Sequence, residues 1–289
     1  MLQRHEGGRG LVNPRCCAGA ILAGLVVALS VFGCRAAPSN GITQVATIDA
    51  LLAGVYDGHM SLATLSQYGD FGIGTFEGLD GEMILLDGTF YKVRADGKVY
   101  RPPLSERTPF ACVTSFLPDC RETISTPIDM KALESRIDAL APQPNRFCAF
   151  IVRGHFRHVR ARSVPAQKKP YPPLAEVTKH QPVFRLSNVS GALVGFRSPE
   201  FVKGVNVPGF HLHFLADDLS GGGHVLDFEL RRGILEADTI HDWLNVYLPV
   251  ESVSFGAADL AKDRSEEIRR VEKDVRPAMP NDPAERDGK

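Results

Sequence analysis

The segment from Gly209 to Leu230 constrains the fold more than any other part of the chain. It reads Gly-Phe-His-Leu-His-Phe-Leu-Ala, then a polar run that ends in three glycines, then His-Val-Leu-Asp-Phe-Glu-Leu. The outer parts have the composition of β-strands, and the middle part has that of a chain reversal. We therefore predict a β-hairpin whose second strand runs over 225–230.

The same hairpin predicts a metal site. Side chains alternate across a strand, so His211 and His213 lie on one face. A reversal centred in the polar run places His224 opposite His213, with Cβ atoms about 5 Å apart. A His-x-His pair alone is more often a polar or packing feature, but the third histidine at hairpin register favours a metal. Three imidazoles around an open position suit a catalytic Zn²⁺, and nickel, iron or manganese would also fit.

Size and charge restrict the class of partner. At 289 residues the chain is long enough for one large domain or two modest ones, and its formal net charge is −1 without a long basic or acidic block in its middle. Such a chain offers no extended basic surface. We therefore expect a small-molecule substrate and no nucleic-acid partner, and a homodimer stays open.

Residues 1–37 have the pattern of an export signal. Three arginines precede an apolar run over 16–33, and small residues follow it. The stretch Val31-Phe-Gly-Cys34 resembles the lipobox of bacterial lipoproteins, which predicts lipidation of Cys34. Cleavage after the run would instead release a soluble protein, and an uncleaved run is almost long enough to anchor the chain as a helix. All three outcomes place the body outside the cytoplasm, periplasmic, secreted or membrane-anchored, with the leader or lipid as the only membrane contact.

The body contains three cysteines, Cys112, Cys120 and Cys148. An odd number does not make a disulfide framework, and at most one pair could close. Cys112 with Cys120 is the local candidate. We expect all three residues to be structural.

The body reads as a sheet-dominated, mixed α/β fold. Three Asp-Gly turns punctuate a meander of strands in the first half, and the second half is also rich in strands. Besides the hairpin, we predict helices over 48–54, 61–67, 130–140 and 259–272, and strands over 72–75, 83–86, 89–93, 99–100, 111–116, 147–153, 155–162, 182–186, 190–196 and 244–248.

We divide the body into two packed β-rich parts, residues 38–150 and 151–272, with the metal site at their junction. The segment 273–289 is rich in proline and charge and is expected to be a flexible tail.

Six short motifs, spread from about residue 44 to 272, resemble the acetolactate decarboxylases in their order and spacing. They are Gly69-Asp-Phe-Gly-Ile-Gly-Thr75, Leu79-Asp-Gly-Glu-Met-Ile84, Ala161-Arg-Ser-Val-Pro165, Pro170-Tyr-Pro172, Pro208-Gly-Phe-His-Leu-His-Phe214 and Gly222-Gly-His-Val-Leu226. The resemblance implies a carboxy-lyase that converts acetolactate to acetoin and CO₂ with a bound Zn²⁺. It implies the three histidines of the hairpin as metal ligands, and it implies three further active-site residues, Glu82, Arg162 and Glu272.

The chemistry explains why these residue types belong together. Loss of CO₂ from a β-keto acid leaves an electron pair that must be held as an enediolate, and in the implied mechanism the zinc chelates the ketone and hydroxyl oxygens and stabilises that species. Arg162 binds the departing carboxylate and helps to deliver a proton to the new carbanion. Glu82 and Glu272 orient the substrate hydroxyl and a metal-bound water. Without the resemblance, each of the three would be read as a solvated charge.

Two other functions fit parts of the pattern. His211-x-His213 followed by Asp217 or Asp218 is similar to the first half of the cupin metal motif, which predicts a metal-dependent dioxygenase or isomerase. In cupins, however, the last histidine comes from a well-separated second motif, whereas His224 follows within one hairpin. The other alternative is an exported lipoprotein that binds a metal or ligand without turnover.

Overall fold

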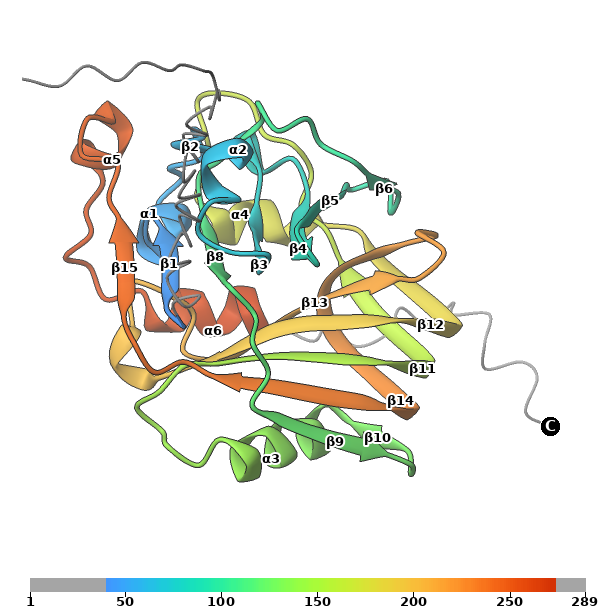
Figure 1. Cartoon of the computed structure of the whole chain (residues 1–289). Coiled ribbons are helices and arrows are strands. Elements are labelled where there is room, and N and C mark those ends of the chain that lie inside the picture. The colour runs from blue at the N-terminus through green and yellow to red at the C-terminus, as the bar shows by residue number, and fades with distance from the viewer. Residues whose placement is uncertain (1–39, 274–289) are drawn as a thin grey trace, which may run out of the picture. The chain divides into compact units, whose positions relative to one another are not determined.

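The computed structural model describes residues 40–273, which lie within one compact unit. Two large β-sheets make up most of this body, and short helices pack around them (Figure 1). The sheet-dominated, mixed α/β fold expected from the sequence is confirmed. The expected leader and, apart from Lys273, the expected tail over 273–289 lie outside the described residues.

The first sheet has seven strands and contains the predicted meander. In spatial order they are β15 (Leu244–Tyr247), β1 (Ile42–Val45), β8 (Ala111–Thr114), β3 (Phe71–Thr75), β4 (Glu82–Leu86), β5 (Thr89–Val93) and β6 (Val99–Tyr100). The Asp-Gly pair at 87–88 takes positive φ angles of 50° and 73° between β4 and β5, as a tight hairpin turn requires. A separate two-stranded sheet joins β2 (Met60–Ser61) to β7 (Arg107–Thr108).

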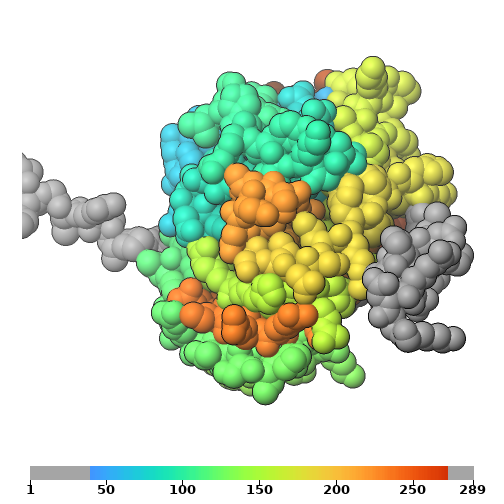
Figure 2. Space-filling view, turned by 90° about the vertical axis from the view of Figure 1, so that its right-hand side faces the viewer, coloured from blue at the N-terminus to red at the C-terminus, as the bar shows by residue number. Residues whose placement is uncertain are grey.

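The second sheet carries the histidines. It contains β9 (Cys120–Ile124), β10 (Ile128–Asp129), β11 (Cys148–Arg162), β12 (Val183–Ser198), β13 (Gly209–Ala216) and β14 (Gly222–Thr239). Because β14 pairs with β13 as well as with β11, the strands β11, β12, β13 and β14 close into a ring. In Figure 2 the tip of the hairpin, in orange, reaches the surface beside the residues of β12, in yellow.

Strands β11 and β12 are longer than predicted, because the expected breaks near residues 154 and 188 do not occur. Gly154 pairs with Gly191 on one side and with Gly233 on the other, so three glycines form a row across neighbouring strands. A Cβ atom at Gly154 would lie 2.9 Å from the Cα of Gly233. These glycines therefore permit close approach of backbones within continuous strands.

The helices are short. The longest, α3 (Met130–Leu140), has the predicted bounds and buries Leu133 and Ile137 against the second sheet. The final helix starts later than predicted, because Asp263 Oδ1 accepts a hydrogen bond from Ser265 N at 2.9 Å. The others are α1 (Ile48–Leu52), α2 (Leu62–Leu65), α4 (Leu174–Val177), α5 (Val253–Ala257) and α6 (Ser265–Lys273), with 3₁₀ turns η1 (Glu77–Leu79), η2 (Thr178–His180) and η3 (Glu200–Val202). In the described part of the chain, no helix has the length and apolar character needed to cross a membrane.

The first part of β11, residues 148–152, is buried on both faces and joins the two main cores. Phe150 and Val152 belong to the core that α3 covers, whereas Ala149 and Ile151 belong to the core between the sheets. The division expected at residue 150 falls inside this strand. Sheet membership also departs from that division, because β9 and β10 pair with β14 and because β15 joins the first sheet.

The three cysteines of the body are free thiols. Cys112 is buried in the core between the sheets, and Cys148 is buried in the core beneath α3. Cys120 lies on β9 of the second sheet and packs against the core of Cys148. The local pair of Cys112 and Cys120 therefore does not form, because the two residues belong to different sheets. The expected structural role agrees with this burial.

Candidate metal centre

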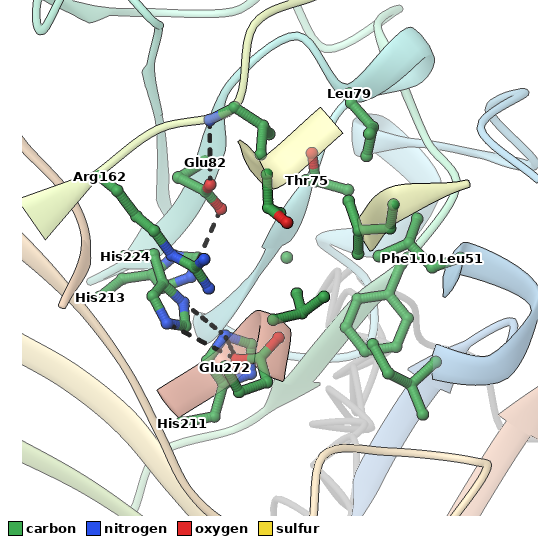
Figure 3. A pocket seen from close by; sticks show the side chains of 16 residues that line it. Leu51, Thr75, Leu79, Glu82, Phe110, Arg162, His211, His213, His224 and Glu272 are labelled. Atoms are coloured by element: carbon green, nitrogen blue, oxygen red, sulfur yellow. Dashed lines mark hydrogen bonds and ion pairs between the residues drawn. The ribbon is translucent and has the colours of Figure 1, made fainter. Parts of the chain in front are cut away.

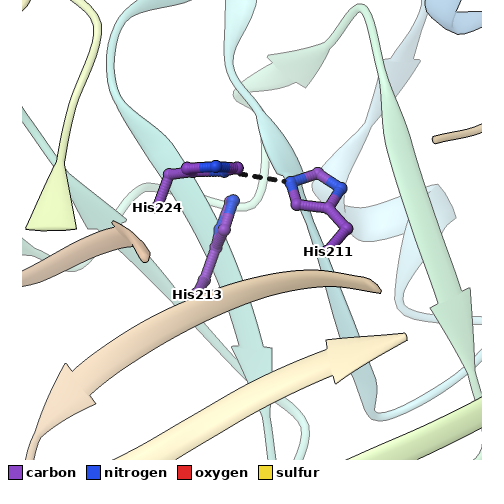
Figure 4. Close-up of side chains that lie close together, drawn as sticks. All are labelled: His211, His213 and His224. Carbon is purple, nitrogen blue, oxygen red and sulfur yellow. Dashed lines mark hydrogen bonds between the residues drawn. The ribbon is translucent and has the colours of Figure 1, made fainter. Parts of the chain in front are cut away.

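The histidine hairpin forms in the predicted register. His213 lies opposite His224, and the turn closes where Ala216 N donates to the carbonyl oxygen of Gly221 at 3.0 Å. One ring nitrogen from each of His211, His213 and His224 lies within 4.8 Å of the others, and all three residues are buried (Figure 4). These atoms could hold a metal ion.

Hydrogen bonding fixes the tautomer of His213. Its Nδ1 donates to the carbonyl oxygen of Met83 at 2.8 Å, across from β13 to β4 of the other sheet. Its Nε2 therefore carries a lone pair, as metal-bound imidazoles do. Among the described residues this buried Nε2 has no hydrogen-bond partner. Buried nitrogens without hydrogen-bond partners are rare, so this nitrogen is a candidate metal ligand.

The other two rings lie beside it, with His224 Nδ1 at 3.2 Å from His211 Nε2. Burial, with the positive charge of Arg162 as the second cause, lowers the pKa of His211 to about 3. Burial also holds the pKa values of His213 and His224 well below the ordinary value. All three imidazoles are therefore neutral near pH 7, which is the form that binds metals.

Two carboxylates approach the histidines from distant parts of the chain. Glu82 begins β4, and its Oε2 lies 3.6 Å from His213 Nε2. Glu272 comes from α6, and its Oε2 lies 3.7 Å from His211 Nε2 and 3.6 Å from His224 Nε2. Figure 3 shows both side chains pointing at the imidazoles.

The environment of Glu82 favours its protonated form. Its Oε1 accepts a hydrogen bond from Val164 N at 3.4 Å. Burial raises the pKa of Glu82 to about 7, although the nearby charge of Arg162 acts in the opposite direction. Such a carboxyl group can both hold and release a proton near neutral pH.

Arg162 is the last residue of β11 and lies directly opposite His224 on β14. Its side chain is 4% exposed and lines the pocket beside Glu82 (Figure 3). The sequence places Arg162, His224 and His213 on three neighbouring strands at one level, since His224 pairs with both of the others. A buried guanidinium next to neutral imidazoles is suited to an anionic ligand.

The pocket extends from this polar end to an apolar end. Figure 3 shows Leu51, Leu79 and Phe110 on the side away from the histidines. Thr75 and Thr178 also line the pocket, and neither was a candidate from the sequence. Thr75 is the last residue of the motif Gly69-Asp-Phe-Gly-Ile-Gly-Thr75, and its place in that motif could have marked it as a site residue. All six candidate site residues from the sequence line this one pocket: Glu82, Arg162, Glu272, His211, His213 and His224.

Comparison with known proteins agrees with the geometry. The sequence model of the alpha-acetolactate decarboxylase family matches residues 42–262. A protein named alpha-acetolactate decarboxylase from Methanosarcina mazei is 48% identical over 235 residues, which cover 81% of each chain. One from Methylococcus capsulatus is 45% identical over 231 residues, covering 80% of this chain and 88% of its own length.

The fold is shared as well. The crystal structure of alpha-acetolactate decarboxylase from Bacillus subtilis strain 168 superimposes with a TM-score of 0.78 at 38% identity, covering 81% of this chain and 99% of the other. Sequence and fold therefore agree over most of the chain. The protein belongs to the alpha-acetolactate decarboxylase family.

Proposed function

We propose that the protein is a carboxy-lyase that converts acetolactate to acetoin and CO₂ with a zinc ion bound by His211, His213 and His224. One observation carries the proposal. In a chain of this family, a single pocket brings Arg162 and two carboxylates beside three neutral imidazoles. This is the set of groups that decarboxylation of a hydroxy-keto acid requires.

The residues present fit a divalent metal. Three imidazoles in one pocket form a donor set that suits catalytic zinc. Among the described residues, the buried Nε2 of His213 has no hydrogen-bond partner. When bound, such an ion supplies Lewis acidity toward the ketone and hydroxyl oxygens and offsets the negative charge that loss of CO₂ leaves.

Arg162 binds the substrate carboxylate in this proposal. Its forked guanidinium matches two carboxylate oxygens, and burial at 4% exposure keeps competing water away. The carboxylate is the group that leaves, so this contact would orient the bond that breaks. Arg162 then helps to return a proton to the carbon that has lost CO₂.

The two glutamates orient the substrate and move protons. The Oε2 atom of Glu82 lies 3.6 Å from His213 Nε2. Its pKa of about 7 in the metal-free protein lets the carboxyl group hold a proton. Glu82 would supply the single proton that Arg162 helps to deliver to the carbon. Glu272 lies between His211 and His224 and faces the same position from α6.

An assay of the purified protein for acetoin formation from acetolactate tests the proposal, with and without a chelator. We expect activity that the chelator abolishes and that Zn²⁺ restores. Protein that binds zinc but forms no acetoin would instead support the non-catalytic binding protein. A cupin-like dioxygenase would need oxygen, so full activity under anaerobic conditions separates the two enzymes.

A matched pair of substitutions in α6 tests the role of Glu272. Glu272→Gln should lower kcat, because the carboxylate no longer faces the histidines. Glu266→Gln lies on the same helix with its side chain 79% exposed, and it should leave kcat within about twofold. Removal of residues 266–289 should impair activity further, since it also removes Ile268 and Val271 from the core around α1. A fully active truncation would exclude Glu272 from the site.

We also propose that the chain is exported. The support is the arginine-flanked apolar run before residue 37, with Cys34 as the lipidation site in a lipobox-like stretch. Export places the enzyme in the periplasm, in the medium or on a membrane surface. Mass spectrometry of the mature N-terminus distinguishes lipidated Cys34 from cleavage beyond it.

Assembly into a homodimer is proposed on the edge of the first sheet. Strand β15 ends that sheet, and the segment 243–250 around it has no charged residue. Trp243, Tyr247 and Val250 are 40%, 44% and 70% exposed there. A second copy can pair with this edge without repulsion between like charges. Light scattering should give a dimer for the native chain and a monomer for Asn245→Lys.

A further inference from the structure

We propose that Lys92 is a positioning residue for Glu82 and that it acts through Asp80. Lys92 is 6% exposed, and its Nζ lies 2.9 Å from Asp80 Oδ2 and also contacts Glu106 Oε1. The ammonium group lies 4.5 Å from the centre of the Phe76 ring. A buried lysine with two carboxylate partners and an aromatic face is held in one place. The inference rests on the proposed role of Glu82.

Lys92 cannot touch the substrate itself. In the pairing of β4 with β5 it lies opposite Met83, so the side chains of these two residues share one face of the sheet. Glu82 is the neighbour of Met83 and points to the other face, where the histidines lie. An effect of Lys92 on the site must therefore pass through the backbone that leads into β4.

That backbone is a constrained turn. Gly78, Leu79 and Gly81 have φ angles of 67°, 56° and 93°, and Asp80 lies between them. Positive φ is unfavourable for leucine, and it persists where surrounding contacts determine the conformation. Leu79 is buried and lines the pocket, and Glu82 follows the turn directly. A small change in this turn therefore moves two pocket residues.

Contacts hold the turn at several points. Thr75 Oγ1 donates to the carbonyl oxygen of Gly81 at 2.8 Å, and Gln167 N donates to that of Gly78 at 2.6 Å. Asp80 is held by Lys92 and, at 2.8 Å, by Nε of Arg94, whose side chain is 45% exposed. Ion pairs at exposed side chains are weak, so Lys92 is the main anchor of the Asp80 carboxylate.

The second partner of Lys92 supplies a matched control. Glu106 lies between β6 and β7, and its backbone bonds to Pro103 and Leu62 rather than to the turn. Asp80 and Glu106 have similar exposure, with side chains 24% and 21% exposed. Loss of either charge leaves the ammonium with one partner. Only Asp80 connects it to Glu82.

The test compares Asp80→Asn with Glu106→Gln for unfolding in urea, zinc content, and kcat and KM on acetolactate. We expect similar losses of stability and full zinc content in both. Because a misplacement of about 1 Å can cost on the order of 10²-fold, kcat should fall at least about tenfold in Asp80→Asn and stay within about twofold in Glu106→Gln. Lys92→Arg should retain more activity than Lys92→Met, since it can still pair with Asp80.

The visible absorption of the Co²⁺-loaded protein provides a readout without substrate. Asp80→Asn should shift this spectrum, because Glu82 lies beside His213, whereas Glu106→Gln should leave it unchanged. Equal effects of the two substitutions on kcat and on the spectrum would overturn the positioning role and leave a structural ion pair. A native protein that forms no acetoin would remove the proposed function, while the Co²⁺ comparison would still decide the role of Lys92.

Discussion

Gly223 lies where the histidine hairpin meets β11, and Gly223→Ala is predicted to disrupt both the fold and the site. The backbone φ of Gly223 is +126°, a conformation that side chains disfavour. A Cβ atom there would lie 2.4 Å from the carbonyl oxygen of Arg162 and 3.2 Å from its carbonyl carbon. The neighbour is backbone in a paired strand, so it cannot move aside without separating β11 from β14.

The magnitude follows from two costs. Adopting such a φ with a side chain costs about 1–3 kcal/mol. Overpacking against rigid backbone adds about 1–3 kcal/mol. We therefore expect Gly223→Ala to lower the free energy of unfolding by about 2–6 kcal/mol in urea titrations. Zinc affinity should fall as well, because His224 is the next residue and pairs with Arg162.

Gly209→Ala is the control for backbone strain alone. Gly209 has a φ of +79° and starts β13, but a Cβ atom there would meet nothing within 4 Å. Its expected cost is about 1–2 kcal/mol without loss of zinc. If both substitutions cost the same and both proteins bind zinc normally, the close approach at Gly223 does not constrain the site.

Three further outcomes are expected. His213→Ala should lose zinc and activity together, as measured by metal analysis and acetoin formation, because it removes the ring that Met83 orients. Arg162→Ala should keep zinc but lose about 10²–10³ in kcat, and a near-normal rate would contradict the carboxylate contact. Burial raises the pKa values of Cys112 and Cys148 to about 12, so near pH 8 only about 10⁻⁴ of each is thiolate, and both should resist alkylation until the pH approaches that value or the chain unfolds.

The histidine hairpin was predictable because the sequence patterns that determine it are local. Alternation along β13 and a glycine-rich reversal fix the relation of His213 to His224 within a dozen residues. The bounds of α3 were also predictable, since Asp129 accepts a hydrogen bond from Ala132 N as an N-cap. In both cases short-range geometry determines the structure.

Features set by distant contacts were not predictable from pattern. Gly154 looks like a strand break in sequence, and only its pairing with Gly191 and Gly233 shows that it serves backbone approach. Glu272 looks like one of several charges on an exposed helix. Packing of Ile268 and Val271 into the core around α1 is what brings its carboxylate to the histidines. The resemblance to a family supplied what periodicity could not.

The ring of β11, β12, β13 and β14 has a consequence for the order of folding. Strand β11 is central, yet both of its partners follow it in the chain, and the ring closes only when β14 returns past the hairpin. Pairings between distant segments form slowly, because the entropy of loop closure is lost before the contacts form. We therefore expect the histidines to meet at a late step of folding. The proposed metal is therefore expected to bind only to the nearly finished protein, so that metal supply affects the yield of active enzyme far more than the rate at which the chain collapses.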